Sequence, residues 1–268
     1  MSPFDEATIV VPTAPDGYAW DVPDGWQQGR GAWGGLVVGA LARSVLDAEP
    51  DSGRTLRSVS AQISAPAVVG RHHIQVRLVR RGRSMSTWSA TLHDEQDRAV
   101  ASLVAILGTA RGADAPEALA RWGRARPPLA PPAGDVPAVA VEPPFGPVFG
   151  RHCSFRPVSG TPLGGGAAES VGWVDFAAPT TRTAISLIAL VDAWWSASLA
   201  ALTELRLFGT VNFMANLLLD PATVPADEPL LQHSFVSAAH EGFVSEHRRL
   251  WTADGRLVVD NLQTIVVG

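Results

Sequence analysis

The sequence predicts an α+β fold in which the chain forms two similar halves, each an antiparallel sheet wrapped around one long helix. Each half contains one apolar run of helical length, followed by about four runs in which apolar and polar residues alternate. The turns between these runs carry glycine or Asp-Gly at matching places in the two halves. A proline-rich stretch separates the halves.

In the first half, residues 32–46 (AWGGLVVGALARSVL) are the helix candidate because they form a long apolar run. The predicted strands on either side of it cover residues 7–11, 18–22, 56–65, 74–81, 85–93 and 99–107. The run 85–93 (MSTWSATLH) alternates most clearly, and Gly82 supplies the turn before it.

In the second half, residues 183–202 (TAISLIALVDAWWSASLAAL) are the corresponding helix candidate. Its predicted strands cover residues 154–158, 169–176, 207–219, 231–239, 243–252 and 257–267. An antiparallel sheet with one apolar face buries that face against an apolar helix. Two such copies in one chain predict a fused pair whose interface resembles that of a symmetric dimer.

The stretch 111–150 contains several proline pairs, such as Pro131-Pro132. Proline fixes φ and lacks an N–H, so this stretch is predicted to be an extended linker with a short helix around residues 117–122. The predicted domains are therefore residues 1–110 and residues 151–268, joined by a linker of residues 111–150.

Composition limits the class of protein. The 268 residues are 46% hydrophobic and 18% charged, which is typical of a globular chain, and the net charge of −5 argues against nucleic-acid binding. No apolar run reaches the roughly 18 residues of a membrane-spanning helix, and the first residues lack the basic segment of a secretory signal. Cys153 is the single cysteine, so no internal disulfide can form and a reducing, cytoplasmic location is expected.

Two glycine-containing segments carry a family resemblance. Residues 29–35 (GRGAWGG) are similar to an R-x-F-G-G signature, with Trp33 in the place of phenylalanine, and residues 80–84 (RRGRS) are similar to an R-x-G-x-S turn. With these motifs in this order, the sequence resembles the TesB-like acyl-CoA thioesterase (thioesterase II) family over nearly the whole chain outside the proline-rich stretch. The resemblance implies a double hotdog fold and an acyl-CoA substrate, and no cofactor or metal is expected.

The resemblance also implies three catalytic positions in the second half. A carboxylate on the helix, a hydroxyl on the next strand and an amide on the last strand match Asp192, Thr210 and Gln263. The family's strand commonly reads T-x-D-H, whereas this chain has Asn212 and Phe213 in place of the last two residues.

Asp192 also stands out without the resemblance. It is the only charged residue between Arg182 and Glu204, in the most apolar helix candidate of the chain. A carboxylate in such surroundings has a raised pKa, which suits a general base that takes a proton from water. The alternative is that Asp192 lies on a polar edge of the helix and faces solvent.

Thr210 and Gln263 carry groups that can hold the same water molecule through hydrogen bonds. Each has an ordinary interpretation as well. A threonine is common in strands for its β-branched shape, and alternation allows Gln263 to face solvent.

The carbonyl oxygen of a thioester needs hydrogen-bond donors where negative charge develops. Gly34 and Gly35 are predicted to supply them, because the N-terminus of a helix has free N–H groups and the positive end of the dipole. Alternatively, these glycines only permit close packing. The first half has Gly39 opposite Asp192 and Ala105 opposite Gln263, which predicts one catalytic centre per chain, between the halves.

Aromatic and basic residues suggest where the two ends of an acyl-CoA bind. The acyl pocket is predicted at Trp33, Trp194, Trp195 and Phe213, although core packing is the ordinary role of such residues. Coenzyme A carries phosphates, for which arginines are suited. The candidates are Arg80, Arg81 and Arg83, together with Arg248 and Arg249, and their alternative is simple solvation.

Other functions have less support in the sequence. No G-x-S-x-G motif is present, and His72, His73 and His93 are interpreted as solvated loop residues. A hotdog hydratase or dehydratase would carry D-x-x-x-x-H, but Ala197 stands five residues after Asp192. A non-catalytic acyl-thioester-binding hotdog protein is a further alternative. Exposed sheet edges are compatible with a homo-oligomer.

Overall fold

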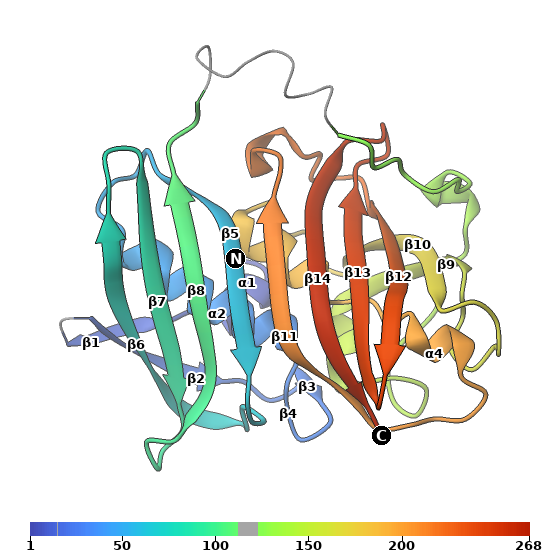
Figure 1. The fold of residues 1–268 in the computed structure, drawn as a ribbon, viewed down its shortest axis with the longest axis horizontal. Helices are drawn as coiled ribbons and strands as arrows, with labels where there is room; N and C mark the ends of the chain where they lie inside the picture. Colours follow the sequence, from blue (N-terminus) through green and yellow to red (C-terminus); the bar gives the residue numbers. More distant parts are fainter. Residues whose placement is uncertain (15, 112–122) are drawn as a thin grey trace.

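The computed structural model describes residues 1–14, 16–111 and 123–268. Its strands form one antiparallel sheet with the order β1-β2-β6-β7-β8-β5-β11-β14-β13-β12-β10-β9 (Figure 1). A separate two-stranded hairpin, β3 (Gln27–Gln28) and β4 (Gly31–Ala32), precedes the first long helix. In the described part of the chain, no helix is both long and apolar enough to cross a bilayer.

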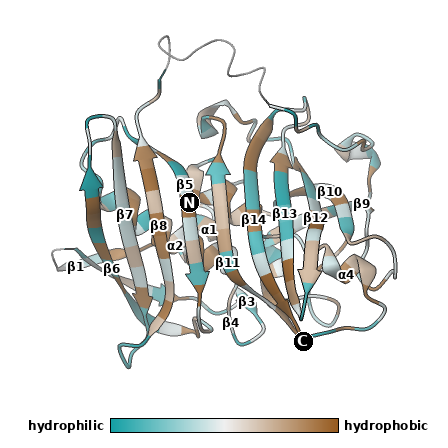
Figure 2. Ribbon diagram, viewed as in Figure 1, coloured by the Kyte–Doolittle hydropathy of each residue, from teal (hydrophilic) through white to brown (hydrophobic). Residues whose placement is uncertain are grey.

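The strands of the first half are β1 (Val11–Ala14), β2 (Gly17–Val22), β5 (Thr55–Ile63), β6 (Gly70–Arg81), β7 (Met85–His93) and β8 (Ala99–Gly108). They form because apolar and polar residues alternate: in β7 every second side chain is buried. Figure 2 shows this alternation as bands of hydrophobic and hydrophilic colour along the strands.

The helix α2 (Gly34–Ala48) packs against the inner faces of β5 to β8. Ten of its residues are buried, so most of its surface is covered by protein, as its apolar sequence predicts. Its own neighbour from the second half is the helix α3.

The second half repeats the same plan. Its strands are β9 (Cys153–Ser159), β10 (Glu169–Phe176), β11 (Phe208–Leu217), β12 (Leu230–His240), β13 (Phe243–Trp251) and β14 (Leu257–Val267). The order β11-β14-β13-β12-β10 mirrors the order β5-β8-β7-β6-β2 of the first half, so the two halves meet at β5 and β11.

The expectation of two separate sheets is wrong, because β5 and β11 pair directly. Five residue pairs join them, from Asn212 opposite Gln62 to Asn216 opposite Ser58. Both strands are therefore internal to a continuous sheet, and neither half has a free edge at the junction.

The expectation of one long helix at residues 183–202 is also wrong. α3 (Ala184–Leu190) is shorter, and Thr183 caps its start: the side chains of Thr183 and Ser186 form a reciprocal capping box. The helix then stops at Leu190, and a turn of residues 191–197 leads to the one-turn helix α4 (Ser198–Ala201). The apolar composition of this run indicates burial correctly, but burial alone does not require a continuous helix.

Two further expectations concern residues 7–11 of the first half and residues 117–122 of the linker. Residues 7–11 do not form a strand: a short helix, α1 (Pro3–Ala7), is capped by Ser2, and β1 begins only at Val11. Serine followed by proline at the first helical position is a helix start that the apolar pattern obscures. The helix expected at residues 117–122 lies outside the described residues.

The proline-rich segment contributes to the core where it is described. It includes the short 3-10 helices η2 (Ala133–Asp135) and η3 (Val148–His152). Val136 is buried against Trp173 and Trp251, and Phe149 stacks on Trp33 with ring centroids 4.7 Å apart. The segment therefore packs on the second half and reaches the start of α2.

Candidate active site

Asp192 lies in the turn that follows α3, and its side chain is only 7% exposed. Its carboxylate accepts hydrogen bonds from the Gln263 amide, at 2.8 Å, and from Arg248, at 3.3 Å; both reach the Oδ1 atom. The other oxygen, Oδ2, lies against Gly34 at the N-terminus of α2. The carboxylate is thus buried between the two halves of the chain and is fully paired at one oxygen.

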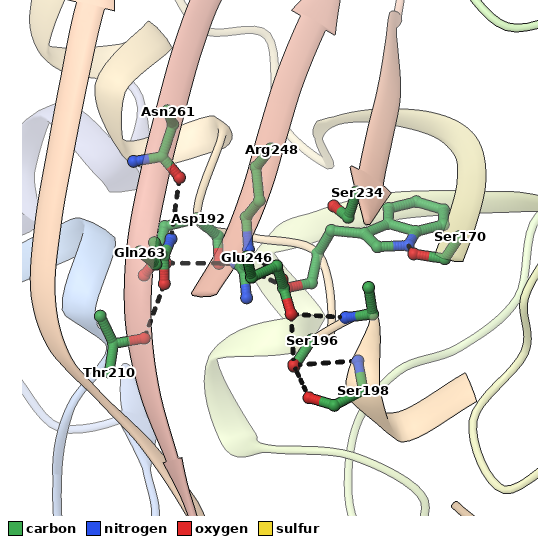
Figure 3. Close-up of polar contacts among 12 residues, drawn as sticks. Ser170, Asp192, Ser196, Ser198, Thr210, Ser234, Glu246, Arg248, Asn261 and Gln263 are labelled. Carbon is green, nitrogen blue, oxygen red and sulfur yellow. Dashed lines mark hydrogen bonds and ion pairs between the residues drawn. The ribbon is translucent and has the colours of Figure 1, made fainter. Parts of the chain in front are cut away.

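Gln263 connects Asp192 to Thr210. It lies on β14 and is completely buried. Its Nε2 donates to Asp192 Oδ1 and, at 3.1 Å, to Asn261 Oδ1, while its Oε1 accepts from Thr210 Oγ1 at 2.7 Å (Figure 3). A continuous chain of hydrogen bonds therefore runs from the Thr210 hydroxyl to the Asp192 carboxylate.

A β-bulge sets the direction of Thr210. Thr210 pairs with Ile265 and Asn212 pairs with Thr264, so Val211 is the extra residue in β11. Because Phe213 points into the core, strict alternation would direct Thr210 away from it. The bulge instead directs the Thr210 hydroxyl to the inner face, where Gln263 lies.

Gly34 and Gly35 let α2 approach Asp192 closely. A Cβ at Gly34 would lie 2.9 Å from Asp192 Oδ2, and one at Gly35 would lie 2.7 Å from the Ala189 carbonyl oxygen. Any larger residue would therefore displace the carboxylate or α3. The Trp33 indole N–H, just before α2, donates to the Asp192 carbonyl oxygen at 3.2 Å.

The pKa of Asp192 is raised above its ordinary value. Burial is the main cause, because it disfavours the charged form, and the nearby Glu246 carboxylate adds to it. The Arg248 guanidinium, the Gln263 amide and the Gly35 backbone N–H favour the charged form and oppose the rise. A carboxylate with a raised pKa is a stronger base than an exposed one, which suits a general base.

Arg248 and Glu246 are buried on β13, and their place beside Asp192 was not predicted from the sequence. Arg248 was expected to bind a phosphate, but it is 3% exposed and contacts Glu246, Asp192 and the turn after α3. Alternation along β13 is the signal that could have placed both residues on its inner face. Arg249 points the other way and pairs with Asp260 at 2.9 Å.

Three of the four predicted acyl-pocket residues, the tryptophans, lie in two different aromatic groups. Trp33 stacks on Phe149, whereas Trp194 packs against Trp195 with ring centroids 4.2 Å apart. Trp33, Trp194 and Phe213 are between 0 and 2% exposed and belong to the main core, while Trp195 is half-buried. Trp33, Trp194 and Phe213 are therefore packed core residues.

Arg80, Arg81 and Arg83 lie at the opposite end of α2 from Asp192. Arg81 pairs at 2.7 Å with Glu49, the residue that ends α2, whereas Asp192 contacts Gly34 at its start. The 15-residue helix is about 22 Å long at 1.5 Å per residue. These arginines therefore lie about the length of α2 away from Asp192, and their role at the phosphates of coenzyme A stays a prediction.

One cluster offers ligand atoms of the kind that bind a metal ion. His73 on β6, His93 on β7 and Asp97 bring one ligand atom each within 4.8 Å of one another, and the two imidazole rings are stacked at 4.7 Å. His73, interpreted as a solvated loop residue, lies on β6, and His93 is the last residue of β7, as in the predicted strand 85–93. The cluster is on the surface of the first half and shares no residue with the Asp192 site.

Comparisons with known proteins agree with one another. Residues 22–110 match the family model of the acyl-CoA thioesterase N-terminal domain, and residues 125–267 match that of the acyl-CoA thioesterase C-terminal domain. Among curated proteins, none matches the sequence.

Solved structures show the same architecture. A conserved protein of unknown function with a hot dog fold from Alicyclobacillus acidocaldarius is similar with a TM-score of 0.90 and 21% identity, covering 100% of this chain and 98% of that one. A putative thioesterase II from Thermobifida fusca has a TM-score of 0.82, 26% identity and the same coverage. The acyl-CoA thioesterase II TesB2 of Mycobacterium marinum has a TM-score of 0.78 and 18% identity, covering 99% and 98%. The fold is therefore a hotdog fold.

Proposed function

The chain belongs to the TesB-like acyl-CoA thioesterase family, and on this premise we propose that Asp192, Thr210 and Gln263 form the centre at which it hydrolyses an acyl-CoA to a free acid and coenzyme A. The observation that carries the proposal is the chain of hydrogen bonds from Thr210 through Gln263 to the buried Asp192. That chain ends against the N-terminus of α2, where an anionic intermediate would be stabilised.

We propose that the attacking water is held by Thr210 and Asp192, with Gln263 as the link between them. Both N–H groups of the Gln263 amide and one lone pair of its oxygen are already used. The Thr210 hydroxyl donates its hydrogen bond to Gln263, so its lone pairs remain to accept a hydrogen bond from water. Asp192 Oδ2 accepts the second hydrogen bond of the water, which leaves a water lone pair free to attack.

In the proposed reaction, the water oxygen adds to the thioester carbonyl carbon while its proton moves to Asp192. The oxyanion that forms is stabilised by the Gly34 N–H and the positive end of the α2 dipole. The carbon–sulfur bond then breaks, the coenzyme A thiolate leaves, and Asp192 returns the proton to the sulfur. Each proton and electron pair is accounted for without a covalent enzyme intermediate.

The alternative nucleophile, Cys153, is unsuited to this role. It is buried at the start of β9, and burial raises the pKa of its thiol well above the ordinary value. A thiol held in the neutral form is a poor nucleophile. This favours a water mechanism.

Replacing the carboxylate tests the proposal directly. In Asp192→Asn, the isosteric amide cannot accept the proton, so kcat for thiol release from acyl-CoAs is expected to fall about 10²- to 10⁴-fold. The melting temperature should be unchanged or higher, because a buried charge is removed. Free thiol is measured with wild type and variant across acyl chain lengths.

Three results would contradict the proposal. Equal activity of wild type and Asp192→Asn would exclude the carboxylate as the base. An inactive wild type on every acyl-CoA would favour an acyl-thioester-binding protein. Hydration of an enoyl-CoA without thiol release would favour a hydratase.

A groove near the start of α2 is our candidate for the phosphates of coenzyme A, in place of the Arg80–Arg83 hairpin. It has a volume of about 500 Å³, and Arg30, Arg71 and Arg98 line it. Arg30 lies four residues before Gly34 on the β3–β4 hairpin, whose Gly31 packs on Pro66 of the groove wall. Guanidinium groups bind phosphates through charge-assisted hydrogen bonds.

Arg30→Ala tests the groove. Arg71 and Arg98 pair with aspartates, whereas Arg30 has no salt bridge within the described residues. We expect its loss to raise KM for acyl-CoA about tenfold, the value of one such contact. KM for the matching acyl-N-acetylcysteamine, which lacks the nucleotide, should not change. Arg83→Ala is the control, and a larger effect there than at Arg30 would refute the assignment.

A further inference from the structure

The turn that carries Asp192 interrupts a helix and frees backbone groups that a helix would have paired. Arg248 Nη1 donates to the carbonyl oxygens of Asp192, at 3.3 Å, and Trp194, at 3.1 Å. Glu246 Oε2 accepts from the Ala197 N–H at 2.9 Å and from the Ser196 hydroxyl at 2.6 Å. Two side chains of one strand thus replace the hydrogen bonds that the helix break removes.

Arg248 and Glu246 also pair with each other. Arg248 Nε donates to Glu246 Oε1 at 2.7 Å, and the two side chains are 4% and 0% exposed. Figure 3 shows Arg248 between Glu246 and Asp192, with the Thr210–Gln263 chain on the far side of Asp192. A buried ion pair is not in itself evidence of stability, because apolar residues of the same volume often stabilise a core as well. Its presence here calls for another role.

We propose that Arg248 and Glu246 are positioning residues for Asp192, and this inference rests on the proposed function. Arg248 holds the backbone and Oδ1 of Asp192 at once, so that Oδ2 is the oxygen left for water. Glu246 holds Arg248 and the far end of the turn at Ala197. The pair therefore sets both the orientation and the protonation of the Asp192 carboxylate.

The charges that act on Asp192 are few. From β13 these are Arg248 and Glu246, whereas β11 and β14 present Thr210, Asn261 and Gln263, which do not titrate in this range. From α2 the carboxylate meets only Gly34 and Gly35. Arg248 lowers the pKa of Asp192 and Glu246 raises it.

These opposite signs give a test that a purely structural role cannot mimic. Arg248→Met removes a positive charge, so the acid limb of the kcat/KM profile, which reports the base in the free enzyme, should move to higher pH by about one unit or more. Glu246→Gln removes a negative charge, so the same limb should move to lower pH. In the double variant the two shifts should largely cancel.

Kinetic constants provide the second measurement. For Arg248→Met, kcat at the pH optimum should fall on the order of tenfold to a hundredfold, since a misplaced base costs reactivity, while KM stays nearly unchanged. Arg248→Lys keeps the charge and should restore the pH profile but only part of kcat, because one ammonium cannot replace the guanidinium contacts. Arg249→Met, on the outer face of the same strand, should behave as wild type.

The outcomes separate the two proposals. An inactive wild type overturns the proposed function and this inference with it. If wild type is active and Asp192→Asn is not, but Arg248→Met and Glu246→Gln keep the wild-type acid limb and kcat, only the positioning role is overturned. If Arg248→Met does not fold, Glu246→Gln and Arg248→Lys decide: unchanged profiles and kcat in both overturn the inference.

Discussion

Single residues at the candidate site act through shape as much as through chemistry. Gly34 is required because Asp192 Oδ2 occupies the space that a Cβ would need, at 2.9 Å. A Cβ at Gly39, further along the same helix, would lie 3.4 Å from the side chain of Ile185, which is an ordinary contact distance. The two glycines therefore differ in what an added methyl group would disturb.

Gly34→Ala should lower kcat about tenfold to a hundredfold by pushing the carboxylate away from its place. Gly39→Ala is the matched control: it improves helix propensity and should leave kcat within the error of the assay. Both variants are measured by thiol release, with melting temperature as the test of folding. Equal losses in the two variants would indicate general disturbance of α2 rather than a contact with Asp192.

At the scale of elements, the bulge at Val211 absorbs one extra residue in β11, so that the Thr210 hydroxyl faces Gln263. β-bulges are often found beside functional sites because they redirect a side chain without ending the strand. Val211 is itself 37% exposed, so the bulge has no buried side chain of its own to accommodate.

Deleting Val211 should restore regular alternation and keep Thr210 on the inner face, because Thr210 would then lie two residues before the inward-facing Phe213. This variant should therefore retain most of its activity. Thr210→Val keeps the β-branched shape but lacks the hydroxyl, so we expect kcat/KM to fall by about two orders of magnitude, because the water would lose one of its two acceptors and the chain to Asp192 would be broken. Circular dichroism tests the strand content of both variants, and wild-type activity in Thr210→Val would refute the role given to the hydroxyl.

For the whole molecule, the shared sheet and core predict that the two halves unfold together. β5 and β11 pair directly, and the main core contains residues of both halves, such as Leu103 and Leu250. α2 and α3 also pack on each other, so neither half can unfold without exposing buried surface of the other half. A chain of this kind is expected to behave as one cooperative unit.

Leu103→Ala provides the test, because Leu103 is 1% exposed on β8, a strand of the first half. The cavity should cost about 2–5 kcal/mol. Hydrogen exchange of β12 and β13 should accelerate to the same extent as that of β6 and β7. Acceleration confined to the first half would show that the halves unfold separately.

Local patterns were enough to predict most strands. Residues 85–93, 169–176 and 257–267 were predicted with the bounds that the structure has, because alternation and turn residues are local signals. The break after Leu190 was not predictable in this way. It depends on Arg248 and Glu246, which are more than 50 residues away and supply the hydrogen bonds that the broken helix lacks.

The sequence by itself determined the repeated plan of the chain, its family resemblance and the choice of Asp192, Thr210 and Gln263 as residues to consider; their catalytic roles stay predictions. Only the tertiary structure decided that the two sheets are one, that Asp192 lies in a turn, and that Arg248 faces it. The physical reason is the distance along the chain over which each signal acts. Periodicity reports which residues are buried, whereas the partner that satisfies a buried charge or a freed backbone group comes from another element and is set by packing.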